Sequence, residues 1–357
     1  MSVEALPEHE GRVHVVLNET STQHKRVLKQ EVADLESILG ERVKRIYTDP
    51  DKSTTQERVA ECIKEGDLIV SAGGDGVDHT IVETLLRYPG LDEKARRTPM
   101  LSLFGGNANQ GPAELTPKRH LKKPPIEEVL NHGKVIDAYA GEVKFEAAEN
   151  LEYFDDENPF TTIESLFIYF TGIGATGHSA NKLHRVRMNR LRIDPTGRNL
   201  IDAPAVLRGI AKARRNKFKI SETSYETAHP EVIVSKSEEE SAYELSYTNG
   251  KYIAKIGRLS SRLEVPDIYK VVLTDGRWPA ISRDVAAMVI GRLTGDHIPS
   301  DLTSRIDYMA LSQDPGTTLM GHIDGDHILL PRNGSMEVKL HPIPYRVVTT
   351  NASKLQS

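Results

Sequence analysis

The sequence predicts an α/β protein in two parts, a doubly wound α/β domain followed by an antiparallel β-sandwich domain. Up to about residue 130, short apolar runs alternate with helical patterns, which is typical of repeated β-α-β units. Those runs are almost continuously apolar, as expected for parallel strands that are covered on both faces. Later segments are short and alternating, with turn residues between them, which favours a sandwich. We therefore expect domains at residues 1–130 and 131–357. Whether the C-terminal tail returns to the first domain is left open.

The first domain is expected to alternate four strands with three helices. Its predicted strands are residues 12–18, 43–48, 67–71 and 99–104, and its predicted helices are residues 27–39, 55–64 and 78–87. The first of these helices should end at Gly40, because glycine tolerates the left-handed backbone of a helix end. In the second domain, strands are expected at 142–146, 165–170, 231–234, 242–245, 269–273, 327–330 and 336–340, and helices at 177–189 and 204–217.

Candidate functional residues follow the predicted parallel strands, where open α/β sheets bind their ligands. The most informative segment is Gly73-Gly74-Asp75-Gly76, which lies between an apolar strand and a helical pattern. Glycines let the backbone approach a ligand, and the N–H groups of a helix start attract phosphate. An acid in such a loop repels phosphate unless it handles a metal or accepts a proton from an attacking hydroxyl. The loop therefore predicts phosphoryl transfer.

Composition narrows the class of protein. Of the 357 residues, 38% are hydrophobic and 27% are charged, which is typical of a soluble globular chain. No apolar run approaches the roughly 20 residues that span a bilayer, and the N-terminus does not have the pattern of a secretory signal. The single cysteine, Cys62, cannot form an internal disulfide, which favours a reducing cytoplasm. The formal net charge of −5 argues against general nucleic-acid binding.

The order of motifs resembles the diacylglycerol kinase catalytic-domain superfamily, which includes bacterial lipid kinases, sphingosine kinases and, more distantly, NAD kinases. Residues 73–76 match the family's Gly-Gly-Asp-Gly-Thr loop, with Val77 in place of threonine. Gly105-Gly106-Asn107 is similar to its Gly-Thr-x-Asn-Asp segment, and Asp324-Gly325-Asp326 to its Asp-Gly-Glu motif. Two weaker likenesses are residues 18–21, at the place of an Asn-Pro-x-Ser/Ala-Gly loop, and residues 171–174, at the place of a Gly-x-Gly turn.

The resemblance implies an ATP- and Mg²⁺-dependent lipid kinase that phosphorylates a hydroxyl of diacylglycerol or a related lipid. The first domain would bind ATP, the second would shape the acceptor pocket, and the active site would be the cleft between them. Asp75 would accept the hydroxyl proton, and Asp324 would face it as a base or as part of the Mg²⁺ network. The residues that would bind the nucleotide are Asn18, Ser21, Thr48, Gly73, Gly74, Gly76, Gly105, Gly106 and Asn107. Pairing into a homodimer is common in the family.

Other interpretations remain open from the sequence. The protein could be a NAD kinase-like enzyme, or a member of the fold that binds nucleotide or lipid without catalysis. Asp75 could simply cap a helix, and Asp324 could belong to an ordinary hairpin turn. The basic stretches 184–192 and 213–219 are either solvated helix faces or a patch for anionic headgroups, which would bring a cytoplasmic protein reversibly to a membrane surface.

Overall fold

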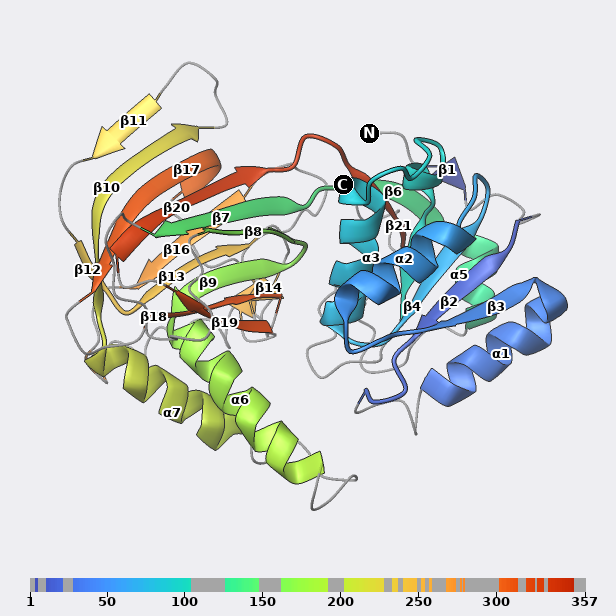
Figure 1. Ribbon diagram of the computed structural model, residues 1–357, viewed down its shortest axis with the longest axis horizontal. Coiled ribbons are helices and arrows are strands. Elements are labelled where there is room, and N and C mark those ends of the chain that lie inside the picture. The colour runs from blue at the N-terminus through green and yellow to red at the C-terminus, as the bar shows by residue number, and fades with distance from the viewer. Residues whose placement is uncertain are drawn as a thin grey trace. The chain divides into compact units, whose positions relative to one another are not determined.

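The computed structural model divides the chain into two compact units (Figure 1). The first comprises Met1–Tyr139 and the C-terminal stretch Pro342–Ser357, and the second comprises Ala140–Ser261 and Pro266–His341. The first unit runs past residue 130 because β6 (Lys134–Ala138) pairs with β21 (Tyr345–Thr349). The residues that the structure describes are 4–5, 11–21, 28–103, 126–147, 162–191, 202–227, 233–236, 240–248, 252–253, 257–258, 268–273, 277, 279, 302–313, 319–324, 326–330 and 333–349.

A seven-stranded sheet forms the centre of the first unit, in the order β1-β6-β21-β5-β4-β2-β3. Strands β21, β5, β4, β2 and β3 are parallel, and β6 is antiparallel to both of its neighbours. The other elements of this unit are β1 (Glu4–Ala5), β2 (Val13–Leu17), α1 (Lys29–Leu39), the 3₁₀ turn η2 (Gly40–Arg42), β3 (Val43–Tyr47), α2 (Lys52–Cys62), β4 (Leu68–Ala72), α3 (Asp75–Arg87), the 3₁₀ turn η3 (Ala95–Arg97), β5 (Met100–Ser102) and α5 (Ile126–His132).

The sheet is covered on both faces, as the apolar runs predict. Strands β2 and β4 are buried along their whole length. Val13 and Val15 face a core cluster that contains Val32 and Leu35 of α1. Helix α3 packs on β4 and against α2, and its Ile81 side chain is fully buried. The doubly wound α/β architecture of the first unit is therefore confirmed.

Local sequence explains where the helices of this unit begin and end. Helix α1 ends before Gly40, whose φ of 59° lies in the left-handed region. Helix α2 begins after Asp51, whose carboxylate accepts a hydrogen bond from the Ser53 N–H at 3.0 Å. Helix α3 begins at Asp75, earlier than the expected residue 78, because Gly74 is extended and serves as the N-cap residue. The glycine loop is thus shorter than expected and runs directly into the helix.

The second unit is built on an antiparallel sheet of twelve strands. The main path is β19-β18-β9-β13-β16-β17-β20-β7-β8. Strand β10 branches from β17 and pairs in turn with β11 and β12. Its elements are β7 (Gly141–Ala147), β8 (Thr162–Phe167), β9 (Phe170–Gly174), α6 (Ala175–Leu191), α7 (Asp202–Arg215), β10 (Phe218–Thr227), β11 (Ile233–Lys236), β12 (Glu240–Ala242), β13 (Glu244–Thr248), β14 (Tyr252–Ile253), β15 (Gly257–Arg258), β16 (Ile268–Leu273), β17 (Leu302–Gln313), β18 (Leu319–Ile323), β19 (Asp326–Leu330) and β20 (Asn333–Leu340).

Two details of the second unit differ from the sequence expectation. The predicted sandwich takes the form of one hydrogen-bonded sheet, because the long strand β17 pairs with β16, β10 and β20. Residues 171–174 form strand β9 between β13 and β18, where a turn was expected. The turn comes at its end, where Gly174 has a φ of 103° and an added Cβ would lie 2.2 Å from the Tyr243 carbonyl oxygen. Glycine is therefore required at residue 174 by both conformation and space.

Helices α6 and α7 of the second unit pack closely together (Figure 1). A Cβ at Gly209 of α7 would lie 2.5 Å from the Ser179 hydroxyl of α6, so the small residue permits this approach. No described helix is both long enough and apolar enough to cross a membrane.

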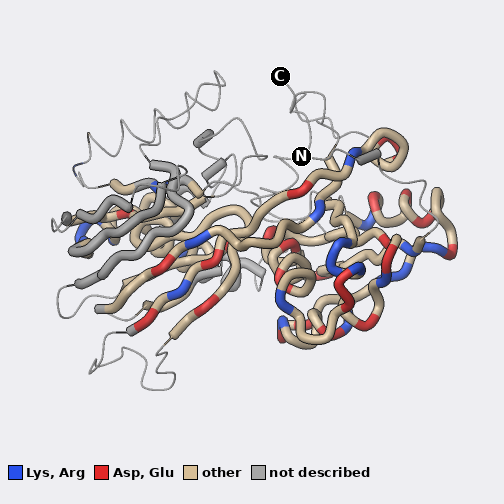
Figure 2. The backbone as a smooth tube through the Cα atoms, turned by 90° about the horizontal axis from the view of Figure 1, so that it is seen from above, with Lys and Arg blue, Asp and Glu red and all other residues tan. Residues whose placement is uncertain are grey.

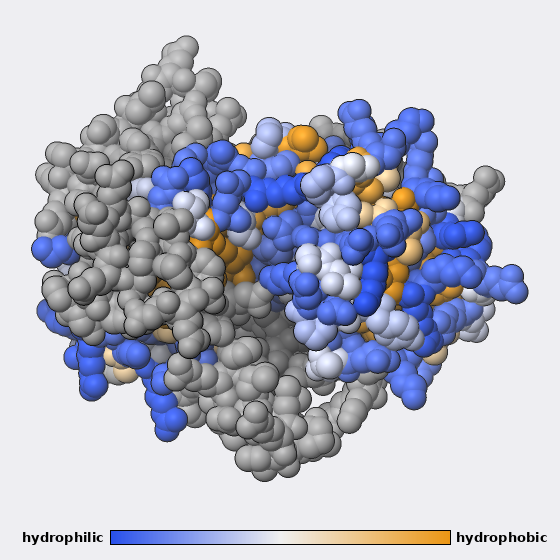
Figure 3. Space-filling model, in the orientation of Figure 1, coloured by the Kyte–Doolittle hydropathy of each residue, from blue (hydrophilic) through white to orange (hydrophobic). Residues whose placement is uncertain are grey.

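The surface of the first unit carries mixed charge. Figure 2 shows acidic and basic residues interspersed along its helices, and several are paired, including Arg45 with Glu36 at 2.7 Å and Arg58 with Asp49 at 3.1 Å. On the face in Figure 3 its described surface is mostly hydrophilic, with apolar residues in small patches. Exposed pairs of this kind contribute little to stability and mainly keep the surface polar.

Candidate active site

The ends of three adjacent parallel strands bring together residues that the sequence singles out. Asn18 follows β2, Thr48 follows β3 and Gly73 follows β4. The Asn18 N–H donates to the Ala72 carbonyl at 3.1 Å, and the Thr48 N–H donates to the Leu17 carbonyl at 3.1 Å. These backbone bonds continue the strand pairing by one residue and hold Asn18, Thr48 and Gly73 at one edge of the sheet. This is the edge at which open α/β sheets bind ligands.

The turn after β2 is shaped by Asn18 itself. Its Oδ1 atom accepts hydrogen bonds from the Thr20 N–H at 3.0 Å and from the Thr20 hydroxyl at 2.7 Å. The Ser21 N–H in turn donates to the Asn18 carbonyl at 3.1 Å. Because its carbonyl oxygen is occupied in this turn, the part of the Asn18 side chain left for a ligand is its amide NH₂ group. Ser21 is placed next to it by the same turn.

Gly73 and Gly76 differ in whether the surrounding structure leaves room for a side chain. A Cβ at Gly73 would lie 2.3 Å from Val77 Cγ2 and 3.4 Å from Asn18 Cβ, so packing within the chain excludes a side chain there. A Cβ at Gly76 would meet no atom within 4 Å. Among the described residues, nothing therefore requires glycine at residue 76, and none of them fills the space beside its backbone.

Asp75 is the first residue of α3 and is half-buried. The N-cap position of this helix is Gly74, which has no side chain and makes no side-chain capping bond. The simple alternative, in which Asp75 is the N-cap residue, is therefore not what the structure has. A carboxylate in the first helical turn is favoured by the helix dipole, so the helix start holds a negative charge next to the open space at Gly76.

A network of buried polar side chains supports the helix behind this loop, and no motif in the sequence marks it. The Ser102 hydroxyl of β5 donates to Asp78 Oδ2 at 2.7 Å, and both side chains are buried. One turn later, His79 Nε2 lies 3.6 Å from Glu83 Oε2, and the Gln56 amide of α2 donates to the same oxygen at 3.0 Å. In the sequence, only the spacing of His79 and Glu83 could have indicated this contact, because side chains four residues apart on a helix are neighbours.

The Glu83 carboxyl in this network stays ionised more easily than usual. Burial by itself would raise its pKa, but the hydrogen bond and charge of His79, with Lys52 and Arg87 nearby, lower the pKa below its ordinary value. The Glu83 carboxylate of α3 thus contacts both His79 on the same helix and Gln56 of α2. These contacts tie α3 to α2, and Asp78 ties it to β5, which fixes the direction in which the loop points.

Asp324 lies in a two-residue hairpin turn between β18 and β19, where Ile323 pairs with Asp326. Its φ of 46° is a left-handed conformation that aspartate tolerates better than most residues. Its side chain is buried and accepts three backbone N–H groups of the β8–β9 turn. These come from Ile168 to Oδ2 at 2.8 Å, and from Tyr169 and Phe170 to Oδ1 at 2.9 and 3.1 Å. Asp324 is thus part of a hairpin turn, which is one of the two alternatives from the sequence. Its carboxylate connects the β18–β19 turn to the β8–β9 turn.

Other predicted positions lie outside the described residues. Gly105, Gly106 and Asn107 are among them, as is Gly325. Of Asp326, only the backbone in β19 is described. Within the part of the chain that the structure describes, no three His, Cys, Asp or Glu side chains gather as a metal site.

The start of α6 in the second unit holds a buried acid. Glu244 accepts the Thr176 N–H at 2.8 Å and the Thr176 hydroxyl at 2.6 Å, and it also accepts the Ser246 hydroxyl. Burial raises the pKa of Glu244 to about 7, although these hydrogen bonds work in the opposite direction. Nearby on α6, burial lowers the pKa of His178 to about 4, with the charges of Lys212 and Lys182 acting in the same direction. Burial therefore favours the uncharged form of both groups.

Comparison with known families shows what the first unit is similar to. Residues 12–140 match the family described as the diacylglycerol kinase catalytic domain. This segment belongs to the diacylglycerol kinase catalytic-domain superfamily. The match covers most of the first unit, including the glycine loop and Asp75, but not the C-terminal stretch that contains β21. A kinase family is thus established for the domain, while the acceptor is not given by the match. A search of curated proteins finds no match to the chain.

Solved structures show the same two-part fold. One is a Bacillus anthracis str. Sterne protein assigned as a diacylglycerol kinase, with a TM-score of 0.57, 14% identity, and coverage of 96% of this chain and 98% of that chain. A second, described as a diacylglycerol kinase of that strain, has a TM-score of 0.55, 12% identity and coverage of 96% and 97%. Yeast NADH kinase complexed with NADH has a TM-score of only 0.45 at 11% identity, which is too low to bear on the function. At these identities the likeness establishes the fold alone.

Proposed function

We propose that this protein is an ATP-dependent kinase that transfers the γ-phosphoryl group to a hydroxyl of diacylglycerol or a related lipid. The kinase family of residues 12–140 supports the reaction type. The observation that carries the proposal is the loop itself, in which Gly76 leaves open space beside the first turn of α3. Backbone N–H groups at a helix start favour phosphate oxygens, and a glycine lets them come close.

In this proposal the nucleotide lies along the edge of the sheet where β2, β3 and β4 end. Gly73, Gly74 and Gly76 follow its phosphates. The Asn18 amide, Ser21 and Thr48 contribute polar contacts from the neighbouring strand ends. The residues proposed from the next strand are Gly105, Gly106 and Asn107, which lie outside the described residues. Phosphoryl transfer needs mainly positioning and charge stabilisation, which a rigid loop between a buried strand and a helix supplies.

Asp75 is the proposed base that accepts the proton of the acceptor hydroxyl. It lies in the loop at the start of α3, at the side of the open space beside Gly76. The same carboxylate suits Mg²⁺, which usually takes one or two protein carboxylates together with phosphate oxygens and waters. Such an ion would neutralise charge on the transferred phosphoryl group when it binds with ATP.

For Asp324 we propose a positioning role in place of the catalytic role that the motif resemblance implies. Both of its carboxylate oxygens already accept backbone N–H groups, at 2.8 to 3.1 Å. Oδ1 accepts two of these bonds and Oδ2 accepts one, so about one lone-pair position of the carboxylate is left for a substrate proton or a metal ion. The residue would instead hold the β18–β19 hairpin against the β8–β9 turn.

A lipid acceptor has to be reached at a membrane surface, and α7 has a face suited to that contact. Arg208, Lys212 and Arg215 lie at helical spacing on α7, next to Leu207, which is 53% exposed. Each basic residue near an anionic bilayer contributes roughly 1 kcal/mol to binding. Three of them with one apolar side chain would give weak, reversible attachment, which fits an enzyme that exchanges lipids.

The proposal is tested by measuring ATP consumption with Mg²⁺ against mixed micelles containing diacylglycerol, monoacylglycerol and sphingoid bases, with NAD in a parallel reaction. A phosphorylated lipid is the expected product, and the lipid that reacts names the acceptor. Formation of NADP in place of a phosphorylated lipid would contradict the lipid assignment. ATP binding without transfer to any acceptor would instead favour a non-catalytic member of the fold. Asp92→Asn, which changes a carboxylate remote from the loop and preserves its turn, is the matched control for Asp75→Asn.

A further inference from the structure

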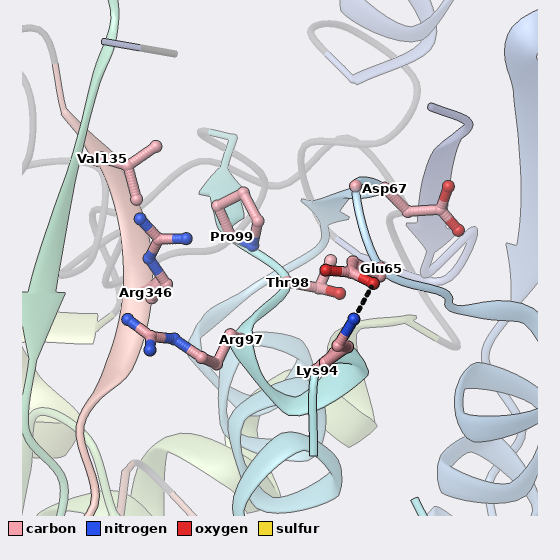
Figure 4. Close-up of a pocket in the computed structure, with 9 residues that line it drawn as sticks. Glu65, Asp67, Lys94, Arg97, Thr98, Pro99, Val135 and Arg346 are labelled. Atoms are coloured by element: carbon pink, nitrogen blue, oxygen red, sulfur yellow. Dashed lines mark hydrogen bonds and ion pairs between the residues drawn. The ribbon is translucent and has the colours of Figure 1, made fainter. Parts of the chain in front are cut away.

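A cavity of about 420 Å³ lies in the first unit at the edge of the sheet away from the glycine loop (Figure 4). Its walls include Asp67 and Pro99, which come directly before β4 and β5. The glycine loop follows the other end of β4. A strand of five residues spans roughly 16 Å, so the two places are separated by about that length. The cavity is within the usual size range of small-molecule pockets, which is about 300–1,000 Å³.

The acidic side chains of this cavity already have partners. Asp67 accepts the Arg12 N–H and the Lys64 N–H, each at 2.9 Å, and lies 2.9 Å from His14 Nε2. Glu65 forms an ion pair with Lys94, with the nitrogen and oxygen 2.9 Å apart, as the dashed line in Figure 4 shows. The two carboxylates are therefore engaged at one side of the cavity.

Two arginines lie at the other side. Arg97 comes from η3, and Arg346 comes from β21, the strand that returns from the C-terminal part of the chain. Figure 4 shows both guanidinium groups directed into the space next to β21. The Arg97 guanidinium makes no hydrogen bond or ion pair with the residues that the structure describes. Arg346 is half-buried in a strand whose other residues are buried. Arg346 has an interaction of its own, so the positive charge at the cavity that lacks a described partner is that of Arg97, and two cations beside one space favour an anion there.

We propose that this cavity binds a small organic anion through Arg97 and Arg346, which would hold a phosphate or carboxylate group between them. Arginine recognises both groups through paired N–H donors in a planar fork, and two arginines together favour a doubly charged group. Pro99 and Val135 supply an apolar wall for a short carbon body, and Thr98 also lines the cavity. The site is independent of the proposed kinase site, since its residues lie at the opposite ends of the strands.

The test is titration calorimetry of the full chain with inorganic phosphate, glycerol 3-phosphate and malonate. The three probes separate a bare phosphate, a phosphate ester and a dicarboxylate as the preferred chemistry. Binding of at least one probe is expected, and Arg97→Gln should weaken it about tenfold or more, since a charge-assisted bidentate contact is lost. If no probe binds, or if Arg97→Gln binds as tightly as the original chain, the proposal is wrong.

Two controls localise the effect. Arg45→Gln removes the same charge from an exposed arginine already paired with Glu36, and it should leave probe binding unchanged. Gly76→Ala alters the other place where phosphate could bind, and it too should leave this binding unchanged. If Gly76→Ala abolishes probe binding while Arg97→Gln does not, the anion binds at the loop and the proposal fails.

A chemical measurement checks the location without a variant. Phenylglyoxal modifies exposed arginines, and modified residues can be identified by peptide mass spectrometry. Arg97 should react in the free chain and be protected by the tightest-binding probe, whereas Arg45 should react equally with and without it. Equal modification of Arg97 in both states would overturn the assignment.

Discussion

The contrast between Gly73 and Gly76 gives the sharpest prediction about the loop. A Cβ at Gly73 would lie 2.3 Å from Val77 Cγ2 and 2.8 Å from Val77 Cβ, and Val77 is itself buried. Gly73→Ala should therefore destabilise the fold by about 1–3 kcal/mol, the usual cost of overpacking. A Cβ at Gly76 meets nothing within 4 Å, and residue 76 is helical. Gly76→Ala should leave stability unchanged or raise it by up to about 1 kcal/mol.

ATP binding, in contrast to stability, should be sensitive to Gly76→Ala. If phosphate approaches the backbone at the start of α3, the methyl group of Gly76→Ala occupies that space and should weaken ATP binding at least about tenfold, the loss expected for one charge-assisted hydrogen bond. Urea unfolding would measure stability, and calorimetric titration with ATP and Mg²⁺ would measure binding. A stable Gly76→Ala protein that binds ATP as tightly as the original chain would refute the reasoning about the loop.

A double variant checks the steric part of this argument. Val77→Ala removes the Cγ2 atom that lies 2.3 Å from the added methyl group but keeps the Cβ atom at 2.8 Å, so it should recover part of the stability lost in Gly73→Ala. In a double-mutant cycle the two changes should therefore be clearly non-additive. Additive effects would mean that the cost of Gly73→Ala has another origin.

The remaining predictions concern the second unit. The pKa of Glu244 is raised from 4.5 to about 7, so the folded chain binds the extra proton, and the stability present below pH 4.5 is lost as the pH rises through 7. Between pH 4.5 and pH 8, the free energy of unfolding of Glu244→Gln should therefore rise by about 3 kcal/mol relative to that of the original chain. Urea unfolding at several pH values measures this difference, and a difference that does not change with pH would contradict the prediction. Asp324→Asn should cost about 2 kcal/mol, because it places an NH₂ group where a backbone N–H now has an acceptor. If that variant were as stable as the original chain but inactive, Asp324 would have a catalytic role after all.

Local pattern predicts the first unit well. The alternation of apolar runs and helical patterns predicts β2, β3, β4 and β5 with their helices, because a parallel sheet covered on both faces requires nearly continuous apolar strands. Local sequence pattern could not predict that β21 lies between β6 and β5 in the sheet. That pairing joins segments about two hundred residues apart in sequence, and no local periodicity carries it.

The same limit applies to the site. The loop at Gly73 and the strand ends at Asn18 and Thr48 follow from the rule that ligands bind where parallel strands end. The role of Asp324 did not follow, since its three N–H donors come from residues more than 150 positions earlier. The convergence of Arg97 and Arg346 depends on the same long-range return of β21. A motif names candidate residues, but only the fold shows which side chains are already engaged.

The most direct test of the central claim is the effect of Asp75→Asn on phosphoryl transfer. With the lipid that the micelle screen identifies, transfer of labelled γ-phosphoryl from ATP should fall about 10²–10⁴-fold in this variant, the range expected when a general base is removed. Stability should change little, because asparagine has the same shape and the N-cap of α3 is Gly74. Asp92→Asn should transfer at the original rate. Full transfer activity in Asp75→Asn would contradict the mechanism, and a loss matched by unfolding would reduce Asp75 to a structural residue.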